Sequence, residues 1–157
     1  MKRLPLFLEI ILELNRLQKD KFKFFIQSDI SKKELDKLLK KIYAKKNQLP
    51  KDKLQIILYS SENDPLVFYN SIEILISTSK TETFGLTCIE AIAMNKKLYT
   101  INSSSIETLF GPVNFNIKED SVEKISVRLI KLFKDDYLFP DISRFTELRM
   151  FEEYSKL

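Results

Sequence analysis

Apolar residues at helical spacing mark three long stretches of the chain. In residues 4–14 they recur every three or four positions, and Pro5 falls in the first turn, where a helix tolerates it. A Lys-rich stretch follows Ser31, which forms with Glu34 the capping-box pattern that opens a helix. The third stretch is 122–133. We predict an amphipathic helix over each of them.

Short apolar runs between these stretches predict strands. They are Phe22–Ile26, Leu54–Leu58, Ile72–Ser77, Leu98–Ile101 and Val113–Ile117. Shorter helices are expected at 63–69 and 86–95, and a terminal helix at 145–157. Strands that alternate with helices over the first 117 residues predict an α/β fold, with a Rossmann-like parallel sheet and helices on both of its faces.

Length and charge agree with one globular domain that binds no nucleic acid. The chain has 157 residues, 44% of them hydrophobic, which is enough for one core and too few for two domains of ordinary size. Its 26 basic and 22 acidic residues are spread along the chain and leave a net charge of +4. Nucleic-acid footprints need clustered basic residues rich in Arg, so we interpret the lysines as solvated helix faces.

Other residue counts narrow the function classes further. A lone cysteine, Cys88, cannot form an intramolecular disulfide, which fits a reducing, cytoplasmic compartment. Histidine is absent, so the commonest metal ligand and the usual base at neutral pH are missing. Lys2 and Arg3 precede an apolar stretch as in a signal peptide, but Glu9 and Glu13 interrupt it. No run reaches the roughly 18 apolar residues of a membrane-spanning helix, so we expect no transmembrane segment.

The residues that suggest chemistry are concentrated in 76–94. A predicted strand ends there, a polar loop containing Gly85 follows, and a helix begins near Leu86. The backbone N–H groups of Leu86, Thr87 and Cys88 would then lie at the carboxyl end of a parallel strand, where anions such as a diphosphate bind. Gly85 lets the backbone approach a ligand closely. Neither a G-x-G-x-x-G motif nor a P-loop is present.

Two carboxylates, Glu82 and Glu90, belong to the same segment. Glu90 lies about one helical turn beyond the helix start, where a carboxylate can accept two hydrogen bonds from a ribose diol, and Glu82 lies in the loop, where it can face a sugar. The alternative is an ordinary capped helix with Glu90 on a solvated face. Spacing alone leaves both interpretations open, because such pairs of carboxylates are common.

The segment from Ile74 to Glu107 resembles the C-terminal domain of retaining GT-B glycosyltransferases of group 1, also called family 4. That class carries a glutamate, seven residues and a second glutamate after a strand and a serine. The matching residues here are Ser79, Glu82, Phe84, Gly85, Leu86, Glu90, Ala91, Ala93 and Met94. The resemblance implies a domain that binds a nucleotide-diphosphate sugar for transfer with retention and without a metal ion, so we expect no metal and no cofactor.

Site roles follow from the same resemblance. Glu82 would be the catalytic residue that contacts the hydroxyls of the donor sugar. Backbone amides of Phe84, Gly85, Leu86 and Thr87 would hold the sugar and the diphosphate, and Glu90 would bind the ribose.

The chain departs from the family pattern at three places. The turn 95–97 reads Asn-Lys-Lys in place of Gly-Lys-Pro, a mild change because Asn tolerates a left-handed cap. The loop 103–107 replaces a Gly-Gly-x-x-Glu loop and keeps the acid, Glu107, without the backbone freedom of glycine. The family's opening strand and its Arg are absent, and only Lys2 can stand for the lysine that follows them.

These departures shape the expected organisation. Residues 1–157 would form the donor-binding domain, and we expect the acceptor-binding N-terminal domain to be absent. Activity would then be incomplete without a separate acceptor-binding subunit or self-association. A non-catalytic interaction protein on a degenerate glycosyltransferase fold is the alternative. Without the central strand, the strands 22–26 and 72–77 either pair directly, which gives a closed five-stranded sheet in a monomer, or keep open edges that attract a partner.

Overall fold

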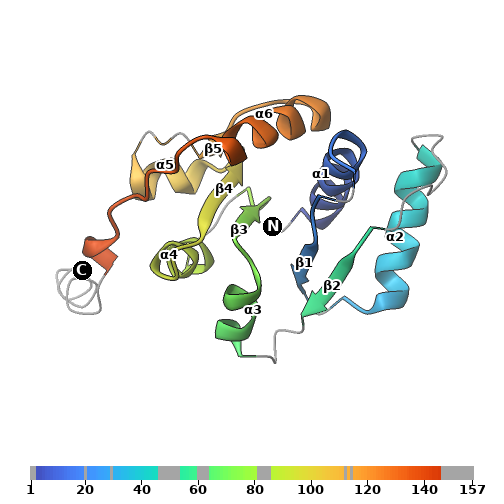
Figure 1. The fold of residues 1–157 in the computed structure, drawn as a ribbon, viewed down its shortest axis with the longest axis horizontal. Coiled ribbons are helices and arrows are strands. Elements are labelled where there is room, and N and C mark those ends of the chain that lie inside the picture. Colours follow the sequence, from blue (N-terminus) through green and yellow to red (C-terminus); the bar gives the residue numbers. More distant parts are fainter. Residues whose placement is uncertain are drawn as a thin grey trace.

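Helices and strands alternate along the chain as the sequence pattern predicts (Figure 1). The structure, a computed structural model, describes residues 3–19, 21–28, 30–45, 54–59, 64–80, 86–111, 113 and 115–145. Its elements are α1 (Leu4–Leu17), β1 (Phe24–Gln27), α2 (Lys32–Lys45), β2 (Ile56–Tyr59), α3 (Pro65–Ser71), β3 (Ile74–Ser77), α4 (Leu86–Ala93), β4 (Lys97–Ile101), α5 (Ser104–Phe110), β5 (Asn116–Ile117), α6 (Val122–Lys134) and the 3₁₀ helix Ser143–Phe145. Each predicted strand overlaps an observed one. Most of the predicted helix 145–157 lies outside the described residues.

Local sequence signals set the ends of several elements. The capping box at α2 is confirmed, because the Ser31 N–H donates to Glu34 Oε2 at 3.0 Å and the Glu34 N–H donates to Ser31 Oγ at 3.3 Å. Asn95 follows α4 with a φ of 55°, the left-handed cap expected of this residue. Asp64 caps α3 by accepting a hydrogen bond from the Leu66 N–H at 2.9 Å.

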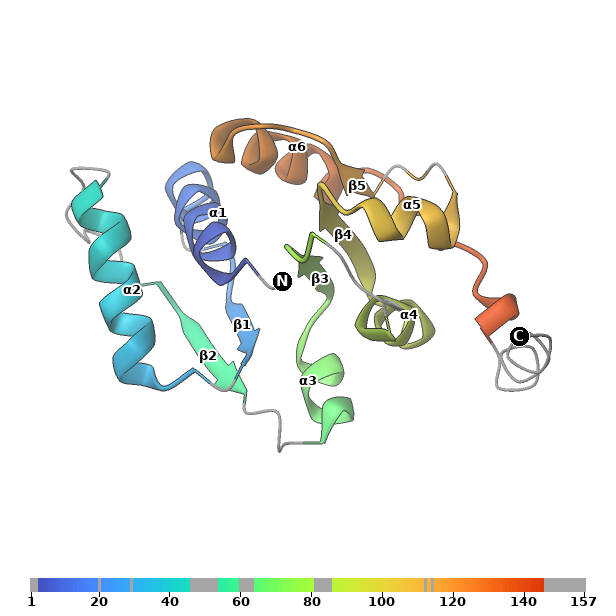
Figure 2. The ribbon, with the colours of Figure 1, turned by 180° about the vertical axis from the view of Figure 1, so that it is seen from behind.

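The strands form two parallel sheets rather than one. β1 pairs with β2, while β3, β4 and β5 pair in that order, and no ladder joins β1 to β3 in the part of the chain described. Both views show β1 and β3 apart (Figures 1 and 2). The prediction of a closed five-stranded sheet is therefore wrong, and the alternative of open facing edges is the one observed.

A cavity lies between these two strands. Leu4 and Phe7 of α1 and Phe68 of α3 line the space between β1 and β3, together with Phe25 and Leu75 from the strands themselves. Paired strands must approach to about 4.8 Å. The cavity agrees with the absence of a ladder between β1 and β3 among the described residues.

One hydrophobic core nevertheless joins the two sheets. Leu8, Ile10, Ile11 and Leu14 of α1 are at most 1% exposed and belong to a cluster that includes residues of β1, β4 and α6. On the side of α3, Tyr59, Phe68 and Tyr69 form edge-on ring contacts with centroids 5.6 Å apart. The covering helices therefore hold the half-sheets together where backbone pairing does not.

A tyrosine completes the hydrogen bonding of β4 on the edge that faces β5. The N–H groups of Thr100 and Asn102 donate to carbonyls of the β5 strand region, Phe115 and Ile117, at 2.8 and 2.9 Å. Leu98 lies on the same edge, where the Leu98 N–H donates to the Tyr137 hydroxyl at 3.0 Å and that hydroxyl donates to the Leu98 carbonyl at 3.1 Å. The hydroxyl thus takes the place of a strand neighbour.

Tyr137→Phe should lower the free energy of unfolding by about 1–3 kcal/mol, because it leaves both backbone groups of Leu98 without a partner. Urea denaturation followed by circular dichroism measures the change. Val127→Ala, at a residue 59% exposed on α6, serves as the control and should change stability by less than about 0.5 kcal/mol. Equal stability of Tyr137→Phe and the wild-type chain would contradict this role of the hydroxyl.

Candidate functional site

The N-terminus of α4 lies where the sequence predicts an anion site. β3 ends at Ser77, and α4 begins at Leu86 with Thr87 exposed in its first turn and Cys88 buried. A helix that starts at the carboxyl edge of parallel strands directs the N–H groups of its first turn toward that edge, a location that favours anions. The predicted residues Lys2, Glu82, Phe84 and Gly85 lie outside the described residues.

Glu90 is held by a buried tyrosine. The Tyr69 hydroxyl donates to Glu90 Oε2 at 2.8 Å and lies 3.2 Å from the Thr87 carbonyl oxygen. Tyr69 is only 2% exposed, and burial, followed by the hydrogen bond to the Glu90 carboxylate, raises the pKa of its phenol. The phenol therefore stays protonated at neutral pH and keeps donating, while Glu90 itself is exposed.

A cavity of about 180 Å³ reaches the first turn of α4 at Thr87; Tyr69 and Glu90 are not part of its lining. Apolar residues of α1, β1, α3 and β3 form much of its lining, and the polar part comes from the carboxyl ends of β1 and β3 and the start of α4: Gln27, Ser28, Ser77, Thr78, Ser79 and Thr87. Hydroxyls both donate and accept hydrogen bonds, so they suit sugar and phosphate oxygens equally. The volume is below the 300–1,000 Å³ typical of whole ligand pockets, so the cavity matches part of such a ligand.

Arg3 brings a positive charge to the same edge. Its Nε donates to the Thr78 carbonyl and its Nη2 to the Ile101 carbonyl, which are at the ends of β3 and β4. The Thr78 hydroxyl donates in return to the Arg3 carbonyl at 3.2 Å. Burial lowers the pKa of the Arg3 guanidinium, which stays charged at neutral pH. The sequence pattern assigns no role to Arg3. Its position beside Lys2, at the start of a helix, is the signal that could have indicated a role in the site.

Tyr69 is the second residue absent from the predicted site. It lies in a short helix that precedes β3, and nothing in its spacing relates it to Glu90. Its apolar neighbours predict burial, and a buried tyrosine usually finds a hydrogen-bond partner for its hydroxyl. That rule predicts a partner without identifying it.

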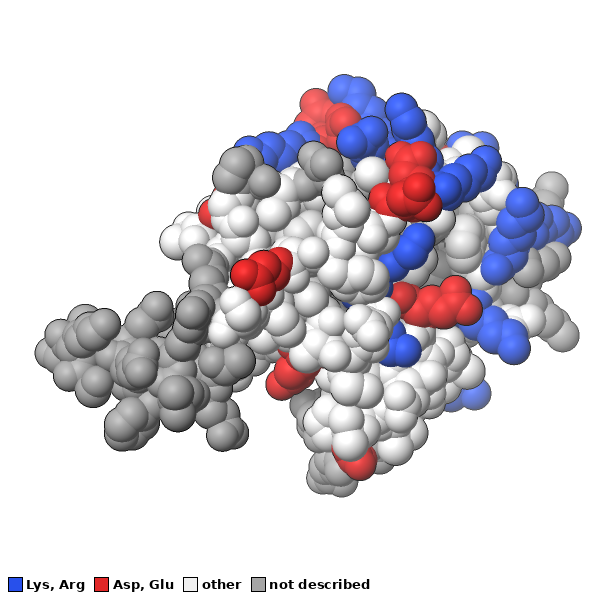
Figure 3. All heavy atoms as spheres, turned by 60° about the vertical axis from the view of Figure 1, so that its left-hand side comes forward, with Lys and Arg blue, Asp and Glu red and all other residues white. Residues whose placement is uncertain are grey.

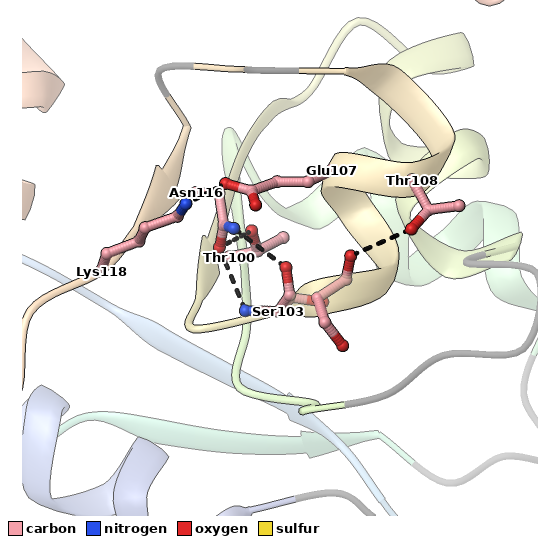
Figure 4. Close-up of polar contacts among 7 residues, drawn as sticks. Thr100, Ser103, Glu107, Thr108, Asn116 and Lys118 are labelled. Carbon is pink, nitrogen blue, oxygen red and sulfur yellow. Dashed lines mark hydrogen bonds and ion pairs between the residues drawn. The ribbon is translucent and has the colours of Figure 1, made fainter.

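Asn116 organises the loop that follows β4 (Figure 4). The Thr100 hydroxyl and the Ser103 N–H donate to Asn116 Oδ1 at 3.0 and 3.1 Å, and Asn116 Nδ2 donates to the Ser103 carbonyl at 2.9 Å. Lys118 Nζ lies 2.6 Å from Glu107 Oε1, and this hydrogen bond holds the pKa of the Glu107 carboxyl below its ordinary value. Glu107, the acid that the loop 103–107 keeps from the family pattern, thus pairs with Lys118.

The family follows from a comparison over almost the whole chain. A family model described as glycosyl transferases group 1 matches residues 1–154. The chain belongs to this family. A curated relative, the capsular polysaccharide biosynthesis glycosyltransferase CapM of Staphylococcus aureus, is 26% identical over 102 residues, which cover 64% of this chain and 27% of CapM.

Two solved structures share the fold of this group 1 glycosyltransferase domain. TarM matches with a TM-score of 0.71 and 22% identity, over 99% of this chain and 32% of TarM. The pneumococcal O-GlcNAc transferase GtfA, solved in complex with UDP and GlcNAc, matches with a TM-score of 0.63 and 16% identity, over 85% of this chain and 26% of GtfA. At these identities the likeness shows the fold alone. The chain spans about a quarter to a third of the length of these relatives.

Charge on the surface is mixed in sign. Figure 3 shows Lys and Arg gathered over the upper and right-hand parts of the view with Asp and Glu among them, whereas much of the other described surface is white. Lys124, for example, pairs with Asp120 at 3.0 Å. Such interleaving is typical of solvated helix faces, and the absence of a nucleic-acid partner stays a prediction.

Two kinds of feature are absent from the described residues. No helix among the described residues has the length and hydropathy needed to cross a membrane. Within the same residues, no group of three or more His, Cys, Asp or Glu side chains is arranged to hold a metal ion.

Proposed function

We propose that this chain is the donor-binding half of a retaining GT-B glycosyltransferase and binds a nucleoside-diphosphate sugar. The observation that carries the proposal is the carboxylate of Glu90 in α4, which accepts a hydrogen bond from the buried Tyr69 hydroxyl; Thr87 of the same helix lines a cavity of mixed polar and apolar character. Membership of the group 1 family and the UDP in the GtfA complex support it.

Each part of the ligand has a counterpart in the proposed site. Glu90 accepts hydrogen bonds from the ribose diol, and the N–H groups of Leu86 and Thr87 bind the diphosphate, with Arg3 adding positive charge at that edge. Glu82 contacts the hydroxyls of the sugar. Backbone amides of Phe84 and Gly85 and the Lys2 side chain complete the set that the family resemblance assigns.

The proposed reaction leaves the anomeric configuration unchanged. The bond between the sugar and the diphosphate breaks, the oxygen of the acceptor hydroxyl forms its bond on the same face of the sugar, and the proton of that hydroxyl passes to the leaving diphosphate. The main task of this domain is to stabilise the charge that develops on the leaving diphosphate. Because positioning the acceptor supplies a large share of the rate, we propose that transfer needs an acceptor-binding domain in addition to this one, and no metal ion.

A direct test is isothermal titration of the purified chain with UDP, GDP and ADP in the presence of EDTA. We expect one of these nucleotides to bind with a Kd in the range of about 0.1–1 mM, because helix N–H and ribose contacts act without the strand-borne Arg of the family. EDTA should leave the affinity unchanged. The absence of heat at millimolar nucleotide would overturn the donor-binding proposal, and binding that requires added Mg²⁺ or Mn²⁺ would overturn its metal independence.

The second candidate function is a non-catalytic interaction protein that keeps the fold without the chemistry. The open edges of β1 and β3 favour it, because unpaired strands attract other polypeptides. A non-catalytic role gives no reason for the hydrogen bond between Tyr69 and Glu90. The same titration separates the two candidates, since an interaction protein of this kind would not bind the nucleotide.

A further inference from the structure

The net positive charge of the chain is concentrated in α2. This helix carries six lysines and two acids, Glu34 and Asp36, whereas the whole chain has 26 basic and 22 acidic residues. The remainder of the chain therefore holds 20 residues of each sign and has no net charge. The net charge of +4 belongs to the 14 residues of α2.

The lysines of α2 lie on the face of the helix that the protein leaves uncovered. The apolar residues of α2 pack against the core, and they are Leu35, Leu38, Leu39, Ile42 and Tyr43. On the opposite face, a shallow hollow is lined only by residues of α2, five lysines together with Asp36 and Ala44. Both views show α2 at an outer end of the molecule (Figures 1 and 2). The basic face is therefore about 20 Å long and open to a partner.

Few acids neutralise this basic face. Among the described residues, Lys45 is the one lysine of α2 that forms an ion pair, with Glu9 at 4.0 Å. The other strongly basic helix, α6, differs, because Lys124 pairs with Asp120 at 3.0 Å and two aspartates follow the helix directly. Acids thus offset the charge of α6 and leave that of α2 largely uncompensated.

We propose that the basic face of α2, centred on Lys33, Lys37 and Lys40, binds the surface of a membrane that contains anionic lipids. These three lysines recur at i, i+4 and i+7, share one face of the helix and are exposed. Clusters of about four to eight basic residues on an amphipathic helix are typical of binding to anionic headgroups. The inference concerns α2 and does not depend on nucleotide binding.

The chemistry of this face favours a membrane over a nucleic acid. Lysine carries a compact charge that is attracted to an anionic surface without a fixed hydrogen-bond geometry. α2 contains no Arg, and its one aromatic residue, Tyr43, packs against the core, so the face lacks the residues that nucleic acids require. Because the core also occupies the apolar face, α2 contacts the headgroups through charge alone and does not insert.

The test is co-sedimentation of the full chain with vesicles of phosphatidylcholine, either alone or mixed with phosphatidylglycerol. At low salt we expect binding to the anionic vesicles only, and release when the salt concentration is raised to about 0.5 M, because salt screens exposed charges. The triple variant Lys33→Gln, Lys37→Gln and Lys40→Gln should bind at least about tenfold more weakly, since each lysine near an anionic leaflet strengthens binding about fivefold.

The matched control replaces three exposed lysines of α6, Lys124, Lys131 and Lys134, by glutamine. It has the same net charge as the α2 variant and should bind within about twofold of the wild-type chain. Both variants should keep the helix content of the wild-type chain in circular dichroism, because all six positions are exposed and glutamine suits a helix about as well as lysine does.

Four results would overturn the proposal. The first is equal binding to both kinds of vesicle, or binding to neither. The second is an equal loss of binding in the α2 and α6 variants, which indicates a response to net charge and not to this face. The third is binding that persists at about 0.5 M salt, which indicates apolar insertion. The fourth is release of the chain from anionic vesicles by a DNA duplex at equal phosphate concentration, which identifies a nucleic acid as the partner.

Discussion

Glu90→Ala is expected to abolish measurable nucleotide binding. Its carboxylate provides the proposed contact to both ribose hydroxyls, and hydrogen bonds to a charged group contribute about 1.5–3 kcal/mol each. Loss of even one such bond weakens binding about tenfold or more, which moves a Kd near 1 mM beyond detection. Titration calorimetry with UDP measures the effect, and Glu123→Ala, at an exposed acid on α6, is the matched control that should bind as the wild-type chain does.

Tyr69→Phe tests whether the position of Glu90 matters as well as its charge. The substitution keeps the ring packing against Phe68 and removes the donor to Glu90 Oε2. We expect UDP binding to weaken about three- to tenfold, less than in Glu90→Ala, because the carboxylate remains but is no longer held.

Glu82→Ala should behave differently from both. A carboxylate that contacts the donor sugar is irrelevant to free UDP, so this variant should retain UDP and lose affinity only for the UDP-sugar. Equal losses for UDP and the UDP-sugar in Glu82→Ala and Glu90→Ala would contradict the two assigned roles.

The elements of the fold could be predicted because their signals are local. The Ser31–Glu34 capping box and the left-handed Asn95 act within a few residues of themselves, and both are confirmed. Alternation of strands and helices then predicts the parallel arrangement without any knowledge of contacts. β5 is shorter than its apolar run suggests, because backbone pairing with β4 extends only over Asn116–Ile117.

The polar contacts of the site could not be predicted, because they join residues far apart in sequence. Tyr69 and Glu90 are 21 positions apart, and Arg3 and Thr78 are 75 apart. Hydrophobic periodicity identifies which face of an element is buried and says nothing about which hydroxyl meets which carboxylate. The split between β1 and β3 is one of two expected outcomes, and sequence alone does not decide between them, because the space between the strands is lined by residues distant in sequence such as Leu4, Phe7 and Phe68.

Asn116→Ala should produce the largest loss of stability among the polar substitutions described. Thr100 and Ser103, the partners of its side chain, are 0% and 2% exposed, so water cannot easily replace the amide. The Ser103 hydroxyl already has no partner among the described residues, so the loop has little polar compensation left. Each unsatisfied buried group costs about 1–3 kcal/mol, and the loss of these contacts should total about 2–5 kcal/mol.

Urea denaturation checks this loss, with Asn70→Ala, at an exposed residue of α3, as the control expected within about 0.5 kcal/mol of the wild-type chain. Because whole domains are stable by only about 5–15 kcal/mol, the variant should unfold at a much lower urea concentration. The effect should also reach the carboxyl edge of β4, since Asn116 holds both polar groups of the Ser103 backbone at the start of α5. A loss of unfolding free energy below about 1 kcal/mol would show that the loop keeps its conformation without the Asn116 amide. The three hydrogen bonds of that amide would then be a consequence of how the loop packs and not the cause of its conformation.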